Sequence, residues 1–223
     1  MKKHRVRRHR TVLLCVPVAV VLLASVLLTQ HNGGGTDWHL WLVNPWNEMP
    51  EGYVPGSLTD IGNGQSVDSR CADDLLQMLD ACAEDGLSPI VCSSYRTQET
   101  QQALFDNKIQ RVMAEQGCDE AEAEKIAATV VARPGTSEHQ LGLAVDIVDE
   151  SYQALDEAQE QTAVQQWLME HSWEYGFILR YPNGESETTG IIYEPWHYRY
   201  VGRDNAKKIY ESGLCLEDYL AQN

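Results

Sequence analysis

The sequence predicts a single α+β domain with a mostly antiparallel central sheet flanked by helices, preceded by an N-terminal transmembrane helix. Segments with helical patterning gather early in the body of the 223-residue chain, whereas most strand-like segments come late. No internal repeat interrupts residues 38–223 and no second linker divides them, so these residues are expected to form one domain.

Capping residues and helix breakers locate the helices. Thr97 caps one helix, and Asp119 with Glu122 three residues later forms a capping box for the next, which must stop before Pro134. Gly86 is a suitable C-terminal residue for the helix before them, which opens at residue 68 or 69. The predicted helices span residues 68–86, 97–117, 119–133 and 157–175, and two short ones begin near residues 204 and 216.

Strands are expected where apolar residues run between turn residues. The segment PIVCS has the composition of a short buried strand. The predicted strands span residues 89–93, 141–148, 177–181 and 197–201.

The N-terminus has the pattern of a membrane anchor. Residues 1–10 carry six basic side chains, and residues 11–28 contain no charge, which as a helix would span about 27 Å. No Ala-x-Ala cleavage site follows, so an uncleaved anchor is expected rather than a removed signal peptide, which would release a secreted domain. The basic flank should stay in the cytoplasm, and residues 38–223 should follow a linker at residues 29–37 as an extracytoplasmic domain.

The charge distribution excludes one class of function. The whole chain holds 17 basic and 33 acidic residues, and without its first ten residues the net charge is −22. Such an acidic body does not attract phosphate backbones, so nucleic-acid binding is not expected. With 43% apolar residues, the composition is that of a globular protein.

Five cysteines lie beyond the anchor, at positions 71, 82, 92, 118 and 215. Because five is odd, at least one must be free or pair with another molecule. Cys71 and Cys82 are about 16 Å apart along one predicted helix, which is too far for a disulfide bond. No Cys-x-x-Cys is present, so a zinc site made of cysteine thiolates is not expected. The cysteines are expected to be small core residues with one or two bridges at most.

The first segment that carries chemistry is SEHQLGLAVD at residues 137–146. If it ends in a strand, Gly142, Ala144 and Asp146 share one face, where the two small residues leave room for a bulky group. A buried Asp146 carboxylate needs a cation or hydrogen-bond donors as compensation. His139, in the preceding turn, can reach over Gly142, so that a histidine and an aspartate converge as metal ligands do. An ion-paired aspartate beside an unrelated surface histidine would give the same segment.

The second segment is YEPWHYRYV at residues 193–201. Pro195 forbids a helix between Glu194 and His197 and places Glu194 before a strand that starts near His197. His197 can supply a neutral imidazole ligand, and Glu194 can serve as a base. Taken alone, His197 could be a core histidine and Glu194 a surface acid. Together the two segments provide the His, Asp, His and free Glu of a zinc hydrolase.

The paired patterns SxHxxGxAxD and ExPWH resemble the zinc D-alanyl-D-alanine carboxypeptidases of the vancomycin-resistance VanY type and their relatives. The resemblance covers about residues 40–220 and is very specific. It implies one zinc ion held by His139, Asp146 and His197, with Glu194 as the catalytic base.

A third segment, SSYRTQETQ at residues 93–101, is similar to the SGYRSxxxQ segment of the same family. The resemblance implies that Arg96 stabilises charge at the scissile carbonyl and that Gln101 and Ser137 contact the substrate. Ser94 replaces the family's Gly and Thr97 replaces its Ser, and neither change removes a reacting group.

The implied reaction is hydrolysis of the terminal D-Ala-D-Ala bond of a peptidoglycan stem peptide or precursor. Glu194 would take a proton from the attacking water and return it to the leaving amine. Three alternatives stay open. An L,D-carboxypeptidase would use the same ligands and base, and an endopeptidase would need an open cleft on the leaving-group side. A non-catalytic wall-binding or zinc-sensing module would have no need of Glu194.

Overall fold

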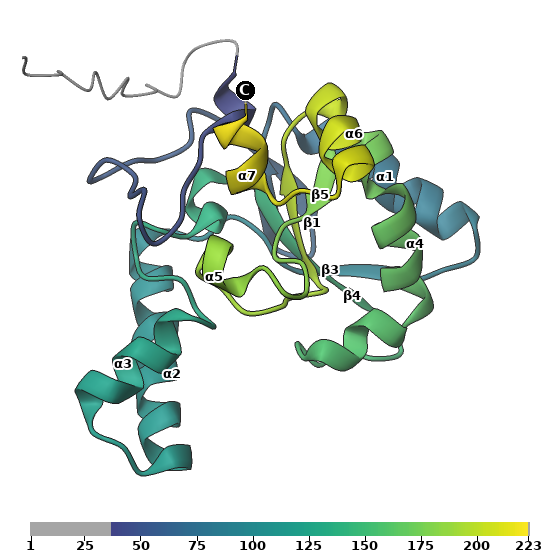
Figure 1. Cartoon of the computed structure of the whole chain (residues 1–223). Helices are drawn as coiled ribbons and strands as arrows, with labels where there is room; N and C mark the ends of the chain where they lie inside the picture. The colour runs from purple at the N-terminus through teal and green to yellow at the C-terminus, as the bar shows by residue number, and fades with distance from the viewer. Residues whose placement is uncertain (1–36, 223) are drawn as a thin grey trace, which may run out of the picture. The chain divides into compact units, whose positions relative to one another are not determined.

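The computed structural model describes residues 37–222, which contain two antiparallel sheets (Figure 1). A four-stranded sheet has the order β3-β4-β6-β5, and β1 and β2 form a separate hairpin. All neighbouring strands are antiparallel, which confirms the predicted class and sheet type. The strands are β1 (Leu58–Gly62), β2 (Gln65–Asp68), β3 (Pro89–Ser93), β4 (Ala144–Asp149), β5 (Phe177–Leu179) and β6 (His197–Tyr200).

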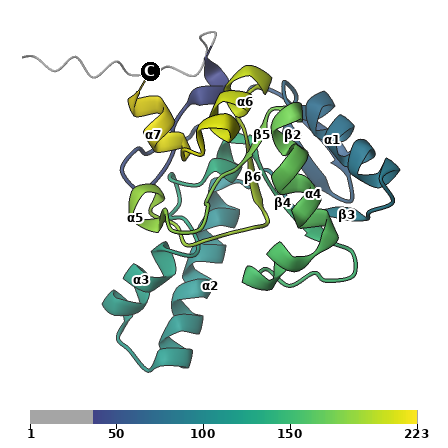
Figure 2. The same ribbon diagram turned by 45° about the vertical axis from the view of Figure 1, so that its right-hand side comes forward.

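Helices flank the four-stranded sheet (Figure 2). Helices α1 and α4 contact each other, and they pack against β3 and β4 respectively, while α6 packs against β5. The α-helices are α1 (Ala72–Glu84), α2 (Gln98–Gln116), α3 (Glu120–Ala128), α4 (Ala163–His171), α5 (Ser186–Thr189), α6 (Arg203–Ser212) and α7 (Leu216–Ala221). The described residues also form the short 3-10 helices η1 (Trp38–Leu40), η2 (Glu138–Leu141), η3 (Glu157–Gln161) and η4 (Ser172–Tyr175).

Apolar and polar side chains alternate along β4 and β6, which gives the sheet one apolar face and one polar face. Val145 and Tyr198 belong to the main core cluster, which also contains Leu75 of α1 and Leu168 of α4. Side chains that alternate with them point to the opposite face. The sheet therefore packs its apolar side on the two helices and leaves its other side for polar residues.

Helices α2 and α3 form a helical hairpin that projects from the rest of the domain (Figure 1). The predicted caps are confirmed: the Thr97 side chain accepts a hydrogen bond from the backbone N–H of Thr100, and Asp119 accepts one from that of Glu122. The hairpin has an apolar cluster of its own, made of Phe105, Ile109, Val112, Ala123 and Ala127. The hairpin is therefore held together mainly by its own packing.

The first helix begins later than the sequence predicts. Asp68 ends β2, and α1 starts only at Ala72. The backbone N–H of Asp68 donates to the Gly142 carbonyl at 2.8 Å, and its carboxylate binds the Arg70 guanidinium at 2.7 Å. The long-range bond to Gly142 keeps Asp68 in the strand.

The β1–β2 hairpin is absent from the sequence prediction. Its turn is formed by Asn63 and Gly64, which have positive φ angles of 52° and 72°. An Asn-Gly pair between two short strands is the usual signal of a two-residue hairpin turn, so the signal for this hairpin is present in the sequence.

Two predicted elements are divided in the structure. The helix predicted over residues 157–175 is η3, α4 and η4, because Thr162 is extended and caps α4 by accepting from the backbone N–H of Gln165. The strand predicted from Leu141 begins at Ala144, because Leu141 ends η2 and Gly142 is left-handed.

All five cysteines in the described part of the chain are free thiols, so the bridges allowed for above are not formed there. Cys71 and Cys82 are buried in the main core cluster. The Cys71 thiol donates a hydrogen bond to the Asp68 carbonyl, three residues earlier, at 3.2 Å. The prediction that the cysteines are mainly small core residues holds for these two and for Cys215, whereas Cys92 is exposed.

Within residues 37–222, no helix combines the length and the apolar character needed to cross a membrane. The anchor predicted at residues 11–28 lies outside the described part of the chain.

Candidate active site

Asp146 lies in the centre of the four-stranded sheet, on β4. Its register partners are Ser93 on β3 and His197 on β6. In an antiparallel sheet, directly opposite residues put their side chains on the same face. The pairing of β4 with β6 therefore brings Asp146 and His197 together, although 51 positions separate them.

His139 reaches the same place from η2. Gly142 ends this 3-10 helix with a φ of 71° and turns the chain into β4. A Cβ atom at position 142 would lie 2.9 Å from the backbone nitrogen of Asp68. The expectation that Gly142 leaves room for a bulky group in the site is therefore wrong, because the glycine is needed for its backbone angle and for the close approach of β2.

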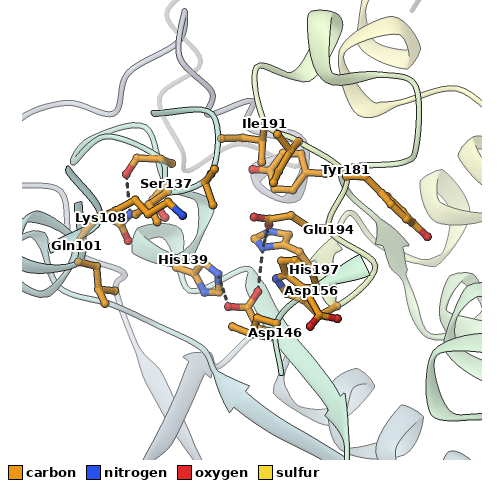
Figure 3. Close-up of a pocket in the computed structure, with 18 of the residues that line it drawn as sticks. Gln101, Lys108, Ser137, His139, Asp146, Asp156, Tyr181, Ile191, Glu194 and His197 are labelled. Atoms are coloured by element: carbon orange, nitrogen blue, oxygen red, sulfur yellow. Dashed lines mark hydrogen bonds and ion pairs between the residues drawn. The ribbon is translucent and has the colours of Figure 1, made fainter. Parts of the chain in front are cut away.

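The side chains of His139, Asp146 and His197 converge (Figure 3). His139 Nε2 lies 3.3 Å from Asp146 Oδ2, and His197 Nδ1 lies 3.1 Å from Asp146 Oδ1. Each residue contributes one donor atom to a group that fits within 4.8 Å, and all three residues are buried. The structure thus brings together the three residues predicted as metal ligands.

The electrostatics of this group fit a metal cation. Burial lowers the pKa of His139 to about 4, and Arg96 adds to this effect, so the ring is neutral as a ligand must be. The other ring nitrogen of His139, Nδ1, lies 2.8 Å from the Ser94 carbonyl, which leaves Nε2 as the free donor. Burial lowers the pKa of His197, but Asp146 and Glu138 more than reverse this and raise it to about 9. These carboxylates therefore favour a positive charge at His197, which is a proton on the ring when no metal is bound.

Glu194 lies next to the three residues but outside their group. A turn through Pro195 closes with the backbone N–H of His197 donating to the Glu194 carbonyl, which confirms the predicted placement before β6. Glu194 Oε2 is 3.6 Å from His197 Nδ1. Burial raises the pKa of Glu194 to about 8, against the opposing effect of His197. A buried carboxylate of raised basicity is suited to accept a proton.

Arg96 is held in place by three side chains. Its guanidinium donates to Asp146 Oδ2 at 2.8 Å, to Ser93 Oγ at 2.9 Å and to Gln101 Oε1 at 3.3 Å. Gln101 in turn donates to the Ala132 carbonyl at 2.7 Å. Arg96 therefore has a fixed position beside the cluster, and Gln101 connects it to the base of the α2–α3 hairpin.

A cavity of about 580 Å³ opens over these groups. Ser137 lines it, as do all the other predicted site residues. Tyr181 and Lys108 are among the lining residues that the sequence analysis did not predict. Tyr181 packs its ring on His197 with 4.7 Å between the centroids, and Lys108 lines the wall formed by α2 (Figure 3). Neither has a motif of its own, although the Tyr lies in the segment GFILRYP and the Lys lies two helical turns after Gln101.

Two imidazoles and a carboxylate in one cluster, with a separate carboxylate and an arginine beside them in a cavity, define a metal-dependent hydrolase. The chain belongs to the VanY family, whose model, described as D-alanyl-D-alanine carboxypeptidase, matches residues 64–203. It is a metallopeptidase of the D-alanyl-D-alanine carboxypeptidase type.

Relatives of known sequence and structure agree with this family assignment. A D-alanyl-D-alanine carboxypeptidase of Enterococcus faecalis is 46% identical over 196 residues, which cover 88% of this chain and 70% of that protein. The VanY D,D-pentapeptidase from a VanB-type vancomycin-resistance cassette, solved as a mutant with Zn(II), has a TM-score of 0.74 and 46% identity over 82% of this chain and 99% of that one. VanYB in complex with D-alanine-D-alanine has a TM-score of 0.75 and 46% identity over 82% and 98% of the two chains.

Proposed function

We propose that the chain hydrolyses the terminal D-Ala-D-Ala bond of peptidoglycan stem peptides with one zinc ion held by His139, Asp146 and His197. The observation that carries the proposal is the convergence of these three side chains beside Glu194 in an open cavity. The family match supports the reaction. The relatives solved with Zn(II) and with D-alanine-D-alanine support the metal and the substrate.

Glu194 is proposed as the proton carrier of the reaction. Zinc, when bound, supplies Lewis acidity that lowers the pKa of water toward about 7. Glu194 accepts a proton from the attacking water and then delivers it to the nitrogen of the leaving D-alanine. Its position supports this role, because it contacts the ligand His197 without being one of the clustered donors.

Arg96 is proposed to stabilise the negative charge that develops on the scissile carbonyl oxygen. A donor fixed before the reaction needs no reorganisation as the charge appears, and the hydrogen bonds to Asp146, Ser93 and Gln101 provide that fixation. The oxygen and the nitrogen of the Gln101 amide both already form hydrogen bonds. Gln101 therefore acts on the substrate indirectly, by holding Arg96 in position.

Ser137 and Lys108 are proposed to contact the substrate directly. The Ser137 side chain lines the cavity and has no hydrogen-bond partner among the described residues. Lys108 is a cation of the cavity wall with no ion pair in the described part of the chain. In a body with a large excess of acidic residues, this lysine favours a carboxylate-bearing peptide in the cavity.

One experiment tests the proposed substrate. The purified chain is incubated with muropeptides that end in D-Ala-D-Ala and, separately, with tetrapeptides that end in a single D-alanine. Release of D-alanine from the pentapeptide alone, detected by mass, is the expected result. Release from the tetrapeptide alone would assign the L,D-carboxypeptidase reaction.

The proposed location follows from the N-terminal sequence. We propose that residues 11–28 anchor the chain in the cell membrane and that the catalytic domain is extracytoplasmic. This location would expose the cavity to the peptidoglycan layer, where stem peptides occur.

A further inference from the structure

Glu138 lies between two site residues in sequence, Ser137 and His139, but it does not line the cavity. Its side chain is fully buried, with 0% exposure. It belongs instead to an ionic cluster behind His197 that includes Arg180 and Arg199, both of which are also completely buried. A buried carboxylate with two buried arginines is costly to desolvate, so its presence needs a reason.

One oxygen of Glu138 contacts both arginines. Arg180 Nε donates to Oε1 at 2.8 Å, and Arg199 Nη1 lies 2.8 Å from the same atom. The remaining donors of the two arginines go elsewhere. Arg180 binds the carboxylate of Glu217 on α7, and Arg199 binds backbone carbonyls of the segment that includes Trp41. The cluster therefore holds the Glu138 side chain in one orientation.

The other oxygen of Glu138 has no hydrogen-bond partner among the described residues, and neither does Nε2 of His197. These two buried atoms are 3.7 Å apart. An unsatisfied buried polar atom is unfavourable, and here a ring nitrogen and a carboxylate oxygen face each other. A closure of less than an ångström would satisfy both.

We propose that Glu138 is a positioning residue that accepts the Nε2 proton of His197 and thereby keeps Nδ1 free for the metal. His139 shows the same arrangement with the opposite nitrogens, because its Nδ1 faces the Ser94 carbonyl and its Nε2 faces Asp146. Metal-ligating histidines commonly donate their second N–H to a carboxylate or a carbonyl, which fixes the tautomer and the ring orientation. The inference rests on the proposed function, because it takes His197 as a metal ligand.

The cluster offers a matched pair of variants. Glu138→Gln and Glu217→Gln each remove one carboxylate charge from the buried arginines, but only Glu138 faces His197. Zinc affinity of the full chain is measured by competition with a chromophoric chelator. We expect the dissociation constant to rise about 10–100-fold for Glu138→Gln and to stay near the wild-type value for Glu217→Gln. An equal loss in both variants would reduce Glu138 to a purely structural role and overturn the proposal.

A second measurement needs no variant and remains valid if Glu138→Gln does not fold. Long-range ¹H–¹⁵N spectra of the zinc-loaded wild-type chain, labelled at histidine, report which ring nitrogen carries the proton. The expected result is a proton on Nε2 of His197 and a metal-bound Nδ1. A proton on Nδ1 would overturn the inference, whereas failure to release D-alanine would contradict the proposed reaction and leave this assignment intact.

Discussion

Arg96 and Asp146 share a 2.8 Å hydrogen bond, and the Asp146 oxygen that accepts it is the same oxygen that faces His139 Nε2. One carboxylate therefore joins the proposed metal ligands to the proposed charge-stabilising residue. The two functions are connected through a single side chain in the middle of β4.

The three hydrogen bonds of the Arg96 guanidinium lead to the first prediction. Arg96→Lys keeps the positive charge but cannot reach Asp146, Ser93 and Gln101 together. We expect kcat to fall by roughly 10²–10³ while zinc remains stoichiometric, because loss of one preorganised donor commonly has this effect. Steady-state D-alanine release and metal content measure the two quantities. An unchanged kcat would remove Arg96 from the charge-stabilising role.

His139→Ala should abolish stoichiometric zinc. The substitution removes one of three clustered donors, and two protein ligands hold zinc poorly. Elemental analysis of the purified variant gives the zinc content, and a chelator should inactivate the wild-type chain in parallel. Full zinc occupancy in the variant would sink the ligand assignment.

Glu194→Gln separates catalysis from metal binding. The variant should keep its zinc and its fold but lose the proton acceptor, so kcat should fall by at least roughly 10³. Substrate binding should change much less, since other groups hold the peptide. Zinc content and D-alanine release from a pentapeptide are compared with wild type. Near-normal turnover would exclude Glu194 as the base, and loss of zinc would make it a ligand.

Gly142→Ala should destabilise the fold by about 1–3 kcal/mol. The left-handed backbone and the contact of a new Cβ with the Asp68 nitrogen both oppose the alanine. Gly64→Ala is the matched control, because Gly64 has a similar φ of 72° but a Cβ atom there would meet no other atom within 4 Å. Denaturant unfolding compares the two variants, and equal losses would show that the close approach of Asp68 has no effect of its own.

The N-terminal prediction concerns the mature chain. Because no small-residue cleavage site follows residues 11–28, the protein should keep them and sediment with membranes. Cell fractionation and N-terminal sequencing check this expectation. A mature sequence that begins near residue 30 would identify a cleaved signal peptide instead.

Local signals in the sequence predict much of the fold. The caps at Thr97 and Asp119 and the strand at residues 89–93 are predicted correctly, because they depend on neighbouring residues. The start of α1 is not, because a contact between Asp68 and Gly142, far away in sequence, keeps Asp68 in a strand. The Asn63–Gly64 turn is a local signal as well, but the sequence prediction did not use it.

The site shows the same division. His139, Asp146, His197 and Glu194 can be found from the sequence because they occur in two short motifs. Lys108 and Glu138 cannot be found in this way. The role of Lys108 depends on α2 forming one wall of the cavity, and the role of Glu138 depends on its position next to His197. Such information comes only from the packing of distant segments.

The bonds of Arg199 determine where a shortened version of this protein can begin. This buried guanidinium donates through Nη2 to the carbonyls of His39 and Trp41 at 3.0 and 2.9 Å, so the first turn after the linker supplies both acceptors of that nitrogen. A recombinant fragment that started beyond residue 41 would expose the guanidinium to water or leave it without acceptors, directly behind His197. Soluble preparations should therefore keep every residue from Asp37 onward, even though the family match starts only at residue 64.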